Sequence, residues 1–261
     1  MEGDLHPERR SFAVGSCIRL SCCAVALVGC GRLGFGDVVP TPDASGDATG
    51  VDAPGLAPIH RYGLAGTLAD DYGGPALVDL GGTFVAGGYQ FAANQGLRLD
   101  NAMPPTAYTV DLAFTFDQLT SWRKILDFDS LTQDTGLYTY ESALQFVIVP
   151  EADFVTAQPT LTAGVQIHAT LTRDAAGSFT AYLDGAPVLA LRDAAPDPPA
   201  TPPATSFAFA DDTAVAALGG ATAYFFTDDT TTTGGEASSG VARAIRIYEG
   251  ALTPAQVAAI Q

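Results

Sequence analysis

The chain has 261 residues, of which 47% are hydrophobic, and it carries 12 basic against 29 acidic side chains, a formal net charge of −17 at pH 7. This excess of negative charge repels nucleic acid and anionic lipid headgroups, so neither is expected as a direct partner. The hydrophobic content is enough for a real core, and the roughly 200 residues that follow the N-terminal segments suit one domain.

The first thirty residues have the pattern of a lipoprotein leader. All four cysteines lie there, and the rest of the chain contains none. Three arginines accompany an apolar run of about ten residues, which is too short to span a bilayer but suits the core of a signal peptide. The run ends in Leu27-Val28-Gly29-Cys30, which resembles the lipobox of bacterial lipoproteins. The resemblance implies that residues 1–29 are removed and that Cys30 is acylated, which anchors the protein in a membrane.

Other interpretations of this region stay open. The segment Glu8-Arg9-Arg10-Ser11-Phe12 resembles the twin-arginine signal, which would imply export of an already folded protein. Alternatively, Cys17, Cys22, Cys23 and Cys30 form disulfides or bind a metal, although no second Cys/His cluster provides the spacing of a zinc site.

Residues 30–58 are expected to form a flexible tether. The segment is rich in Gly, Pro, Asp and Ala and has few residues able to build a core, a composition that stays extended. It would hold the domain of residues 59–261 away from the membrane. We therefore expect a protein of the bacterial cell envelope, lipid-anchored at the outer membrane or cell surface.

From residue 60 onward, alternating apolar and polar side chains predict β-strands. Large apolar residues occupy every second position of residues 108–117, and the same period recurs over residues 167–172 and 179–184. Asp184-Gly185 then has the composition of a type I′ turn, with residues 188–191 as the returning strand. Further strands are expected at residues 89–93, 96–100, 122–128, 136–149, 207–210, 221–227 and 242–248.

The C-terminus carries the signal of one helix. Thr253 can cap it, Pro254 suits the first helical position, and Gln256 completes a capping box. The Pro-rich segment 193–205 is expected to be a loop. About a dozen short strands and a short C-terminal helix predict an all-β fold, a two-sheet antiparallel sandwich.

Several segments, taken in order, resemble laminin-G-like jelly-roll domains of the concanavalin A-like lectin/glucanase superfamily. They are Tyr62-Gly63-Leu64, Ala69-Asp70-Asp71-Tyr72-Gly73-Gly74, Tyr89-Gln90-Phe91, Gly96-Leu97-Arg98-Leu99, His168–Asp174, Tyr182-Leu183-Asp184-Gly185 and Ala244–Pro254. The resemblance covers residues 60–261. It implies two curved antiparallel sheets, often a bound calcium, and binding of glycans or proteins rather than catalysis.

Two acidic loops are candidate calcium sites, because calcium takes about six to eight oxygen ligands, many of them carboxylates. Asp228, Asp229 and Glu236 lie on one long loop, and Asp70 and Asp71 lie on another. The alternative explanation is turn formation, since aspartate and glycine are common turn residues.

Sugar binding needs an aromatic platform with a few polar groups. Trp122, Tyr138, Tyr140 and Tyr182 are the candidates, together with Tyr224. Each of them could equally pack inside a sandwich.

No catalytic residue is predicted, and we expect a non-catalytic module that binds a glycan or a surface protein outside the cytoplasm. One alternative is a polysaccharide-degrading enzyme. Asp127 and Asp129 alternate on a predicted strand, and two carboxyl groups at a suitable separation can hydrolyse glycosides. The other alternative is a purely structural envelope lipoprotein.

Overall fold

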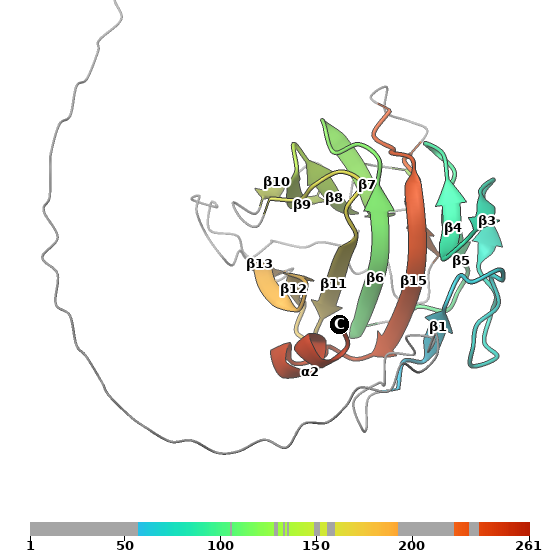
Figure 1. Ribbon diagram of the computed structural model, residues 1–261. Coiled ribbons are helices and arrows are strands. Elements are labelled where there is room, and N and C mark those ends of the chain that lie inside the picture. Colours follow the sequence, from blue (N-terminus) through green and yellow to red (C-terminus); the bar gives the residue numbers. More distant parts are fainter. Residues whose placement is uncertain are drawn as a thin grey trace, which may run out of the picture. The chain divides into compact units, whose positions relative to one another are not determined.

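The computed structural model describes residues 57–104, 106–127, 130–132, 134, 136–148, 152–155, 160–192, 222–229 and 235–261. These residues form two antiparallel β-sheets and one short helix at the C-terminus (Figure 1), which confirms the predicted all-β sandwich. No helix among them is long and apolar enough to cross a membrane.

Some sequence predictions concern residues outside those described. The signal peptide of residues 1–29, the lipidation of Cys30 and nearly all of the tether of residues 30–58 belong to this group. The expected strand at residues 207–210 and the expected loop at residues 193–205 belong to it as well. All of them stay predictions.

The first sheet, called sheet A, is built around two long central strands. Its spatial order is β13 (Ala186–Arg192), β12 (Ser178–Leu183), β11 (Ile167–Arg173), β6 (Tyr108–Phe116), β15 (Gly240–Glu249), β4 (Gly88–Phe91) and β3 (Thr83–Val85). β1 (His60–Tyr62) pairs with β15 off this path. β6 and β15 lie far apart in the sequence, so their pairing joins distant segments in the middle of the sheet.

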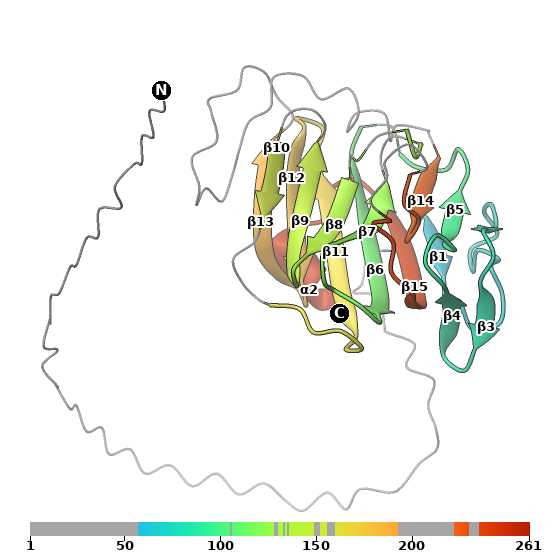
Figure 2. The same cartoon turned by 90° about the horizontal axis from the view of Figure 1, so that it is seen from above.

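The second sheet, called sheet B, has the order β10 (Ala152–Val155), β9 (Ala143–Ile148), β8 (Gly136–Tyr140), β7 (Trp122–Asp127), β14 (Ala223–Phe225), β5 (Leu97–Leu99) and β2 (Val78–Asp79). The pairing of β7 with β8 contains a bulge between Lys124 and Leu126. The two sheets are layered face to face, as Figure 2 shows.

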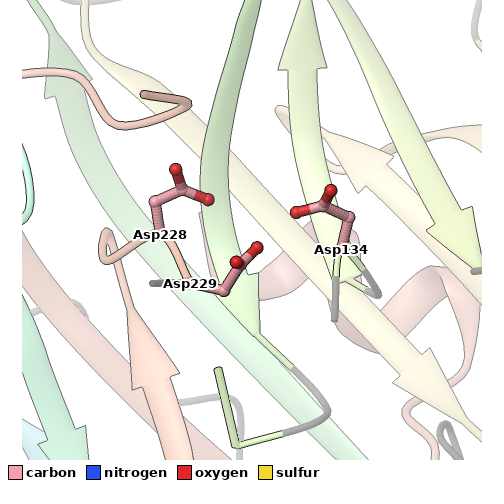
Figure 3. Close-up of side chains that lie close together, drawn as sticks. All are labelled: Asp134, Asp228 and Asp229. Atoms are coloured by element: carbon pink, nitrogen blue, oxygen red, sulfur yellow. The ribbon is translucent and has the colours of Figure 1, made fainter. Parts of the chain in front are cut away.

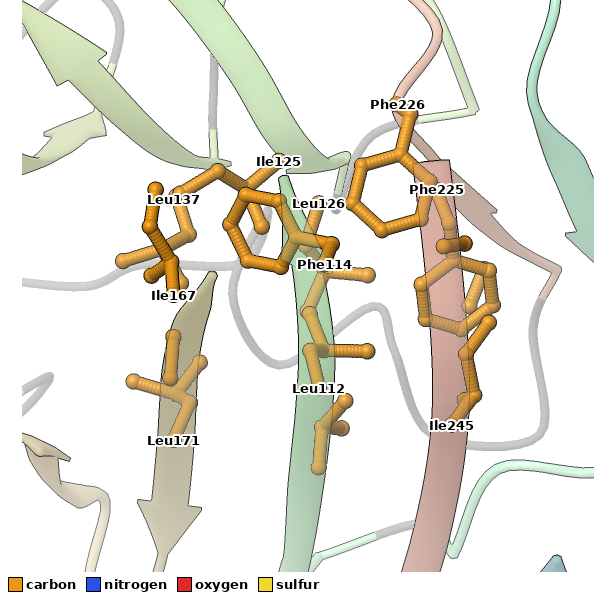
Figure 4. Packing of buried hydrophobic residues seen from close by; sticks show 14 of the residues in the cluster. Leu112, Phe114, Ile125, Leu126, Leu137, Ile167, Leu171, Phe225, Phe226 and Ile245 are labelled. Atoms are coloured by element: carbon orange, nitrogen blue, oxygen red, sulfur yellow. The ribbon is translucent and has the colours of Figure 1, made fainter. Parts of the chain in front are cut away.

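The core lies between the two sheets. Alternate residues of β6 point into it, including Leu112 and Phe114, and they meet Ile125 and Leu126 of sheet B (Figure 4). Each such side chain contributes about 1.5–3 kcal/mol by leaving water. Phe226, directly after β14, stacks on Phe91 with ring centroids 4.8 Å apart. This packing fixes the chain immediately before the acidic residues that follow.

Two turns show how far the sequence determined the strand pairing. At Asp184-Gly185 both residues have positive φ, 47° and 76°, so the predicted type I′ turn is confirmed. The prediction of a single strand over residues 136–149 is wrong. Glu141 and Ser142 have φ of 45° and 70° and turn the chain between β8 and β9. Glutamate and serine are not favoured at positive φ, so no residue type at these positions signals the turn.

One end of the face of sheet A away from the core is covered by α2 (Pro254–Ala259), which lies against that sheet (Figure 1). The predicted capping box of Thr253 and Gln256 is confirmed. The helix buries Val257 in a second apolar cluster with Tyr182 and Tyr248. The part of this face around Tyr182 and Tyr248 is therefore occupied by packing.

A polar network continues along the same face beside the helix. The carboxylate of Asp111 accepts hydrogen bonds from Thr170 at 2.7 Å and Arg246 at 3.0 Å, and it lies 2.7 Å from the His168 ring. Arg246 also donates to the carbonyl of Ile260 at 2.9 Å, which ties the end of the chain to the sheet. The His168 side chain is only 11% exposed, because Asp111 holds it within this network.

Candidate functional site on sheet B

Lys124, the only lysine of the chain, is fully buried on β7. Its ammonium lies 2.8 Å from Asp127 Oδ2 and 4.0 Å from Asp229 Oδ2. It also lies 5.0 Å from the ring centroid of Tyr138, the residue opposite it on β8. A buried ammonium is costly without partners, and here carboxylates and an aromatic face supply them.

A cluster of carboxyl groups surrounds this lysine. Asp134, Asp228 and Asp229 each place one oxygen within 4.8 Å of the others. Figure 3 shows the carboxyl groups of Asp134 and Asp229 directed toward one another. Asp134 precedes β8, whereas Asp228 and Asp229 follow β14, so the cluster joins segments far apart in the sequence.

Glu236 closes the cluster through its backbone. Its N–H donates to Asp228 Oδ2 at 2.7 Å, and its carbonyl accepts the N–H of Lys124 at 2.8 Å. The other oxygen of Asp228, Oδ1, is buried and has no hydrogen-bond partner among the described residues. The structure thus brings together Asp228, Asp229 and Glu236, as the sequence suggested. It adds Asp134, which the sequence analysis missed.

Burial, together with the nearby carboxylates of Asp134 and Asp228, raises the pKa of Glu236 to about 7, while Lys124 opposes the rise. Burial likewise raises the pKa of Asp134 to about 6, helped by its hydrogen bond and charge interaction with Asp229. A divalent cation would offset the repulsion between neighbouring carboxylates that favours the protonated forms of Glu236 and Asp134. The cluster therefore has the composition and electrostatics of a cation site, and calcium suits its carboxylate oxygens.

An aromatic pair lies beside the cluster on the same face of sheet B. Trp122 and Tyr140 are opposite each other on β7 and β8, with ring centroids 4.6 Å apart. Trp122 also meets the edge of Tyr138 at 5.7 Å. Tyr140 is 38% exposed and Trp122 is half-buried, and neither belongs to a core cluster.

Tyr138 connects the aromatic pair to the acidic cluster. The ring is fully buried, and its hydroxyl donates to Asp134 Oδ1 at 3.4 Å. Burial, reinforced by the charge of Asp134, raises the pKa of this hydroxyl, so it stays protonated and remains a donor. The aromatic pair and the carboxylates thus form one continuous site.

The remaining aromatic candidates lie elsewhere. Tyr182 is on sheet A, where it is 3% exposed and packs with α2. Tyr224 is on β14 of sheet B, half-buried, with the Arg98 guanidinium 6.0 Å from its ring centroid.

The other acidic candidates are also separate from the cluster. Asp70 holds its own loop together by accepting N–H groups of Arg61 at 2.9 Å, Gly74 at 3.0 Å and Tyr72 at 3.1 Å, and it pairs with His60 at 2.7 Å. The neighbouring Asp71 lies 3.4 Å from the Arg61 side chain.

The two carboxyl groups of the hydrolase alternative are not seen together. Asp127 is fully buried against Lys124, and Asp129 lies outside the described residues.

The fold has counterparts among solved structures at low sequence identity. Domain 4 of an extracellular GH43 arabinanase from Geobacillus stearothermophilus, solved with arabinotriose, has a TM-score of 0.53 and 17% identity, and the match covers 79% of this chain and 99% of that one. Trypanosoma rangeli sialidase, solved with 2,3-difluorosialic acid, gives 0.54 and 14%, covering 79% of this chain and 32% of the sialidase. The botulinum neurotoxin serotype D ligand binding domain, solved with N-acetylneuraminic acid, gives 0.50 and 11%, covering 77% and 49%.

These likenesses show the fold. The chain spans about a third of the sialidase and about half of the toxin fragment, but nearly the whole arabinanase domain. Comparisons with protein-family models and with curated proteins gave no match.

The raised pKa of Glu236 predicts a pH-dependent stability. Between its unfolded value of 4.5 and about 7, the folded protein binds more protons than the unfolded chain, so the free energy of unfolding falls as pH rises through this window. Glu236→Gln removes that loss. In a chelator, thermal unfolding should show the variant gaining stability over the wild type between about pH 5 and about pH 8. Glu249→Gln, which alters an exposed carboxyl on β15, serves as the control. If Glu236→Gln differed from the wild type in stability by the same amount at about pH 5 and about pH 8, the raised pKa of Glu236 would be contradicted.

Loss of the Lys124 ammonium should be strongly destabilising. Lys124→Met leaves buried carboxylates without their cation, which costs about 3–5 kcal/mol when one partner of a buried pair is removed. Urea unfolding measures the loss, and added calcium should restore part of it. Arg123→Gln is the matched control, because the Arg123 guanidinium binds the carbonyls of Trp122 and Gly235 instead of a carboxylate. A Lys124→Met protein as stable as the control would show that the ammonium is dispensable.

Proposed function

We propose that the chain is a non-catalytic glycan-binding module whose ligand stacks on Trp122 and Tyr140. The observation that carries this proposal is the partly exposed aromatic pair on the outer face of sheet B, outside both core clusters. Aromatic faces bind the apolar faces of sugar rings, while nearby polar groups select hydroxyl positions. The fold is shared with a domain solved in complex with arabinotriose and with a toxin domain solved with N-acetylneuraminic acid, which supports a binding role.

The same proposal includes a calcium ion held by Asp134, Asp228 and Asp229. Two observations support it: the three oxygens lie within 4.8 Å of one another, and the buried Asp228 Oδ1 has no hydrogen-bond partner in the part of the chain that the structure describes. Calcium bound there would hold the chain after β14 against the chain before β8. Tyr138, bonded to Asp134, would thereby be fixed beneath Trp122. The ion has a structural role in this arrangement.

The module is, in this proposal, attached to the bacterial cell envelope through an acylated Cys30. The support comes from the sequence alone: an apolar run ending in Leu27-Val28-Gly29-Cys30 and a tether rich in Gly, Pro and Asp. The anchor would present the sandwich outside the cytoplasm, where glycans are displayed.

Glycan binding should depend on the aromatic pair. Trp122→Ala and Tyr140→Ala should each weaken binding to a ligand found on a glycan array by at least about tenfold, as expected for a central aromatic contact. Titration calorimetry measures the change. Tyr72→Ala is the matched control, because Tyr72 is 50% exposed in the loop after β1. A blank array, together with capture of a surface protein that requires Trp122, would favour the protein-binding alternative.

Membrane attachment should depend on Cys30. A Cys30→Ser protein should lose incorporation of labelled fatty acid and leave the membrane fraction, while Cys23→Ser should retain both. Continued labelling of the Cys30→Ser protein would refute lipidation at this residue.

A further inference from the structure

Basic side chains are concentrated on sheet A. Five arginines belong to its strands: Arg61, Arg173, Arg192, Arg243 and Arg246. The other basic residues beyond residue 57 are Arg98 on β5 and Arg123 and Lys124 on β7, all on sheet B. The segments after residue 57 that lie outside the described residues contain no lysine or arginine in their sequence. The site on sheet B therefore draws its basic groups from these three side chains.

Each of the three is already engaged. Arg98 reaches the carboxylate of Asp100 with Nε at 2.8 Å and Nη2 at 3.0 Å. Arg123 Nη1 donates to the carbonyls of Trp122 at 2.8 Å and Gly235 at 3.3 Å. Lys124 is fully buried beside Asp127 and is out of reach of a ligand on the surface.

Carboxyl groups, in contrast, flank the aromatic pair on two sides. Glu141, next to Tyr140, is exposed and accepts the N–H of Ser121, the residue before Trp122, at 2.9 Å. On the other side lies the acidic cluster, which Tyr138 joins to the pair. The carboxyl groups of this cluster and of Glu141 outnumber the combined positive charge of Lys124, Arg123 and one divalent cation; those of the cluster belong to Asp127, Asp134, Asp228, Asp229 and Glu236.

The field at the pair is therefore negative whether or not a cation is bound. Charges within about 8 Å of a ligand are not fully screened at physiological ionic strength, so an acidic sugar placed there is repelled. Of its possible basic partners, Arg98 is paired with Asp100, Lys124 is buried, and Arg123 already donates to two backbone carbonyls. Burying or half-burying the carboxylate of such a sugar without a partner has a high desolvation free energy.

We propose that the glycan bound by Trp122 and Tyr140 carries no acidic group, and that sialylated and uronic-acid glycans are excluded by charge. The inference rests on the proposed glycan-binding function. Of the sugars in the similar structures, arabinotriose has the required chemistry and N-acetylneuraminic acid does not.

The test uses the full chain and a glycan array with matched pairs, such as galactotriose with trigalacturonic acid and lactose with sialyllactose, in calcium and in chelator. Hits are titrated by calorimetry and by the fluorescence of Trp122, the single tryptophan of the chain. Binding confined to glycans without acidic groups supports the inference. An acidic glycan that binds as well as its uncharged counterpart overturns it and leaves the glycan-binding function standing. No binding to any glycan overturns both.

Variants at Glu141 separate charge from shape. Glu141→Gln keeps an oxygen that can accept the Ser121 N–H, whereas Glu141→Lys places a cation beside the pair. The affinity for acidic glycans relative to their uncharged counterparts should rise in the order wild type, Glu141→Gln, Glu141→Lys, by about tenfold or more across the series. An unchanged ratio would overturn exclusion by charge.

Discussion

The ion pair between the buried Lys124 ammonium and Asp127, with Asp229 at a longer distance, is the contact on which the candidate site depends. It brings one positive charge into a group of carboxyl groups that would otherwise repel one another. It also fixes β7 against the chain that follows β14. Because both ions are withdrawn from water, the pair adds little net stability of its own, but removing either partner leaves an uncompensated buried charge. The geometry of the acidic cluster therefore rests on this one lysine.

The sandwich determines which surface remains for a ligand. Its two inner faces form the core, and on the outer face of sheet A the helix α2 and the Asp111 network occupy a large part of the surface. The outer face of sheet B carries the partly exposed Trp122 and Tyr140 instead. Phe226 links the core to the acidic cluster on sheet B. Its ring packs in the core, and its N–H donates to the carbonyl of Ile125 at 3.0 Å. Asp228 follows two residues later in the chain. Core packing thus positions the acidic residues.

Local patterns in the sequence predicted the parts of the structure that local forces decide. The period of two over β6, the Asp184-Gly185 turn and the capping box at Thr253 were all visible, and Asp228, Asp229 and Glu236 were recognised as one acidic loop. Contacts between distant segments were not visible. Asp134 stands alone in its own segment, so its meeting with Asp228 depends on how β7, β8 and β14 pair. The short strands β1, β2, β3 and β10 were missed, because two to four residues are too few to show a period.

The isolation of Lys124 has a practical consequence for the chemistry of the folded protein. Its ammonium is the only lysine amine of the chain and is fully buried, so amine-directed labels and cross-linkers do not reach it while the sandwich is intact. A lysine-specific protease likewise has a single cleavage point, in the middle of β7. That bond becomes accessible only when sheet B opens, so its cleavage reports directly on the part of the fold that carries the candidate site.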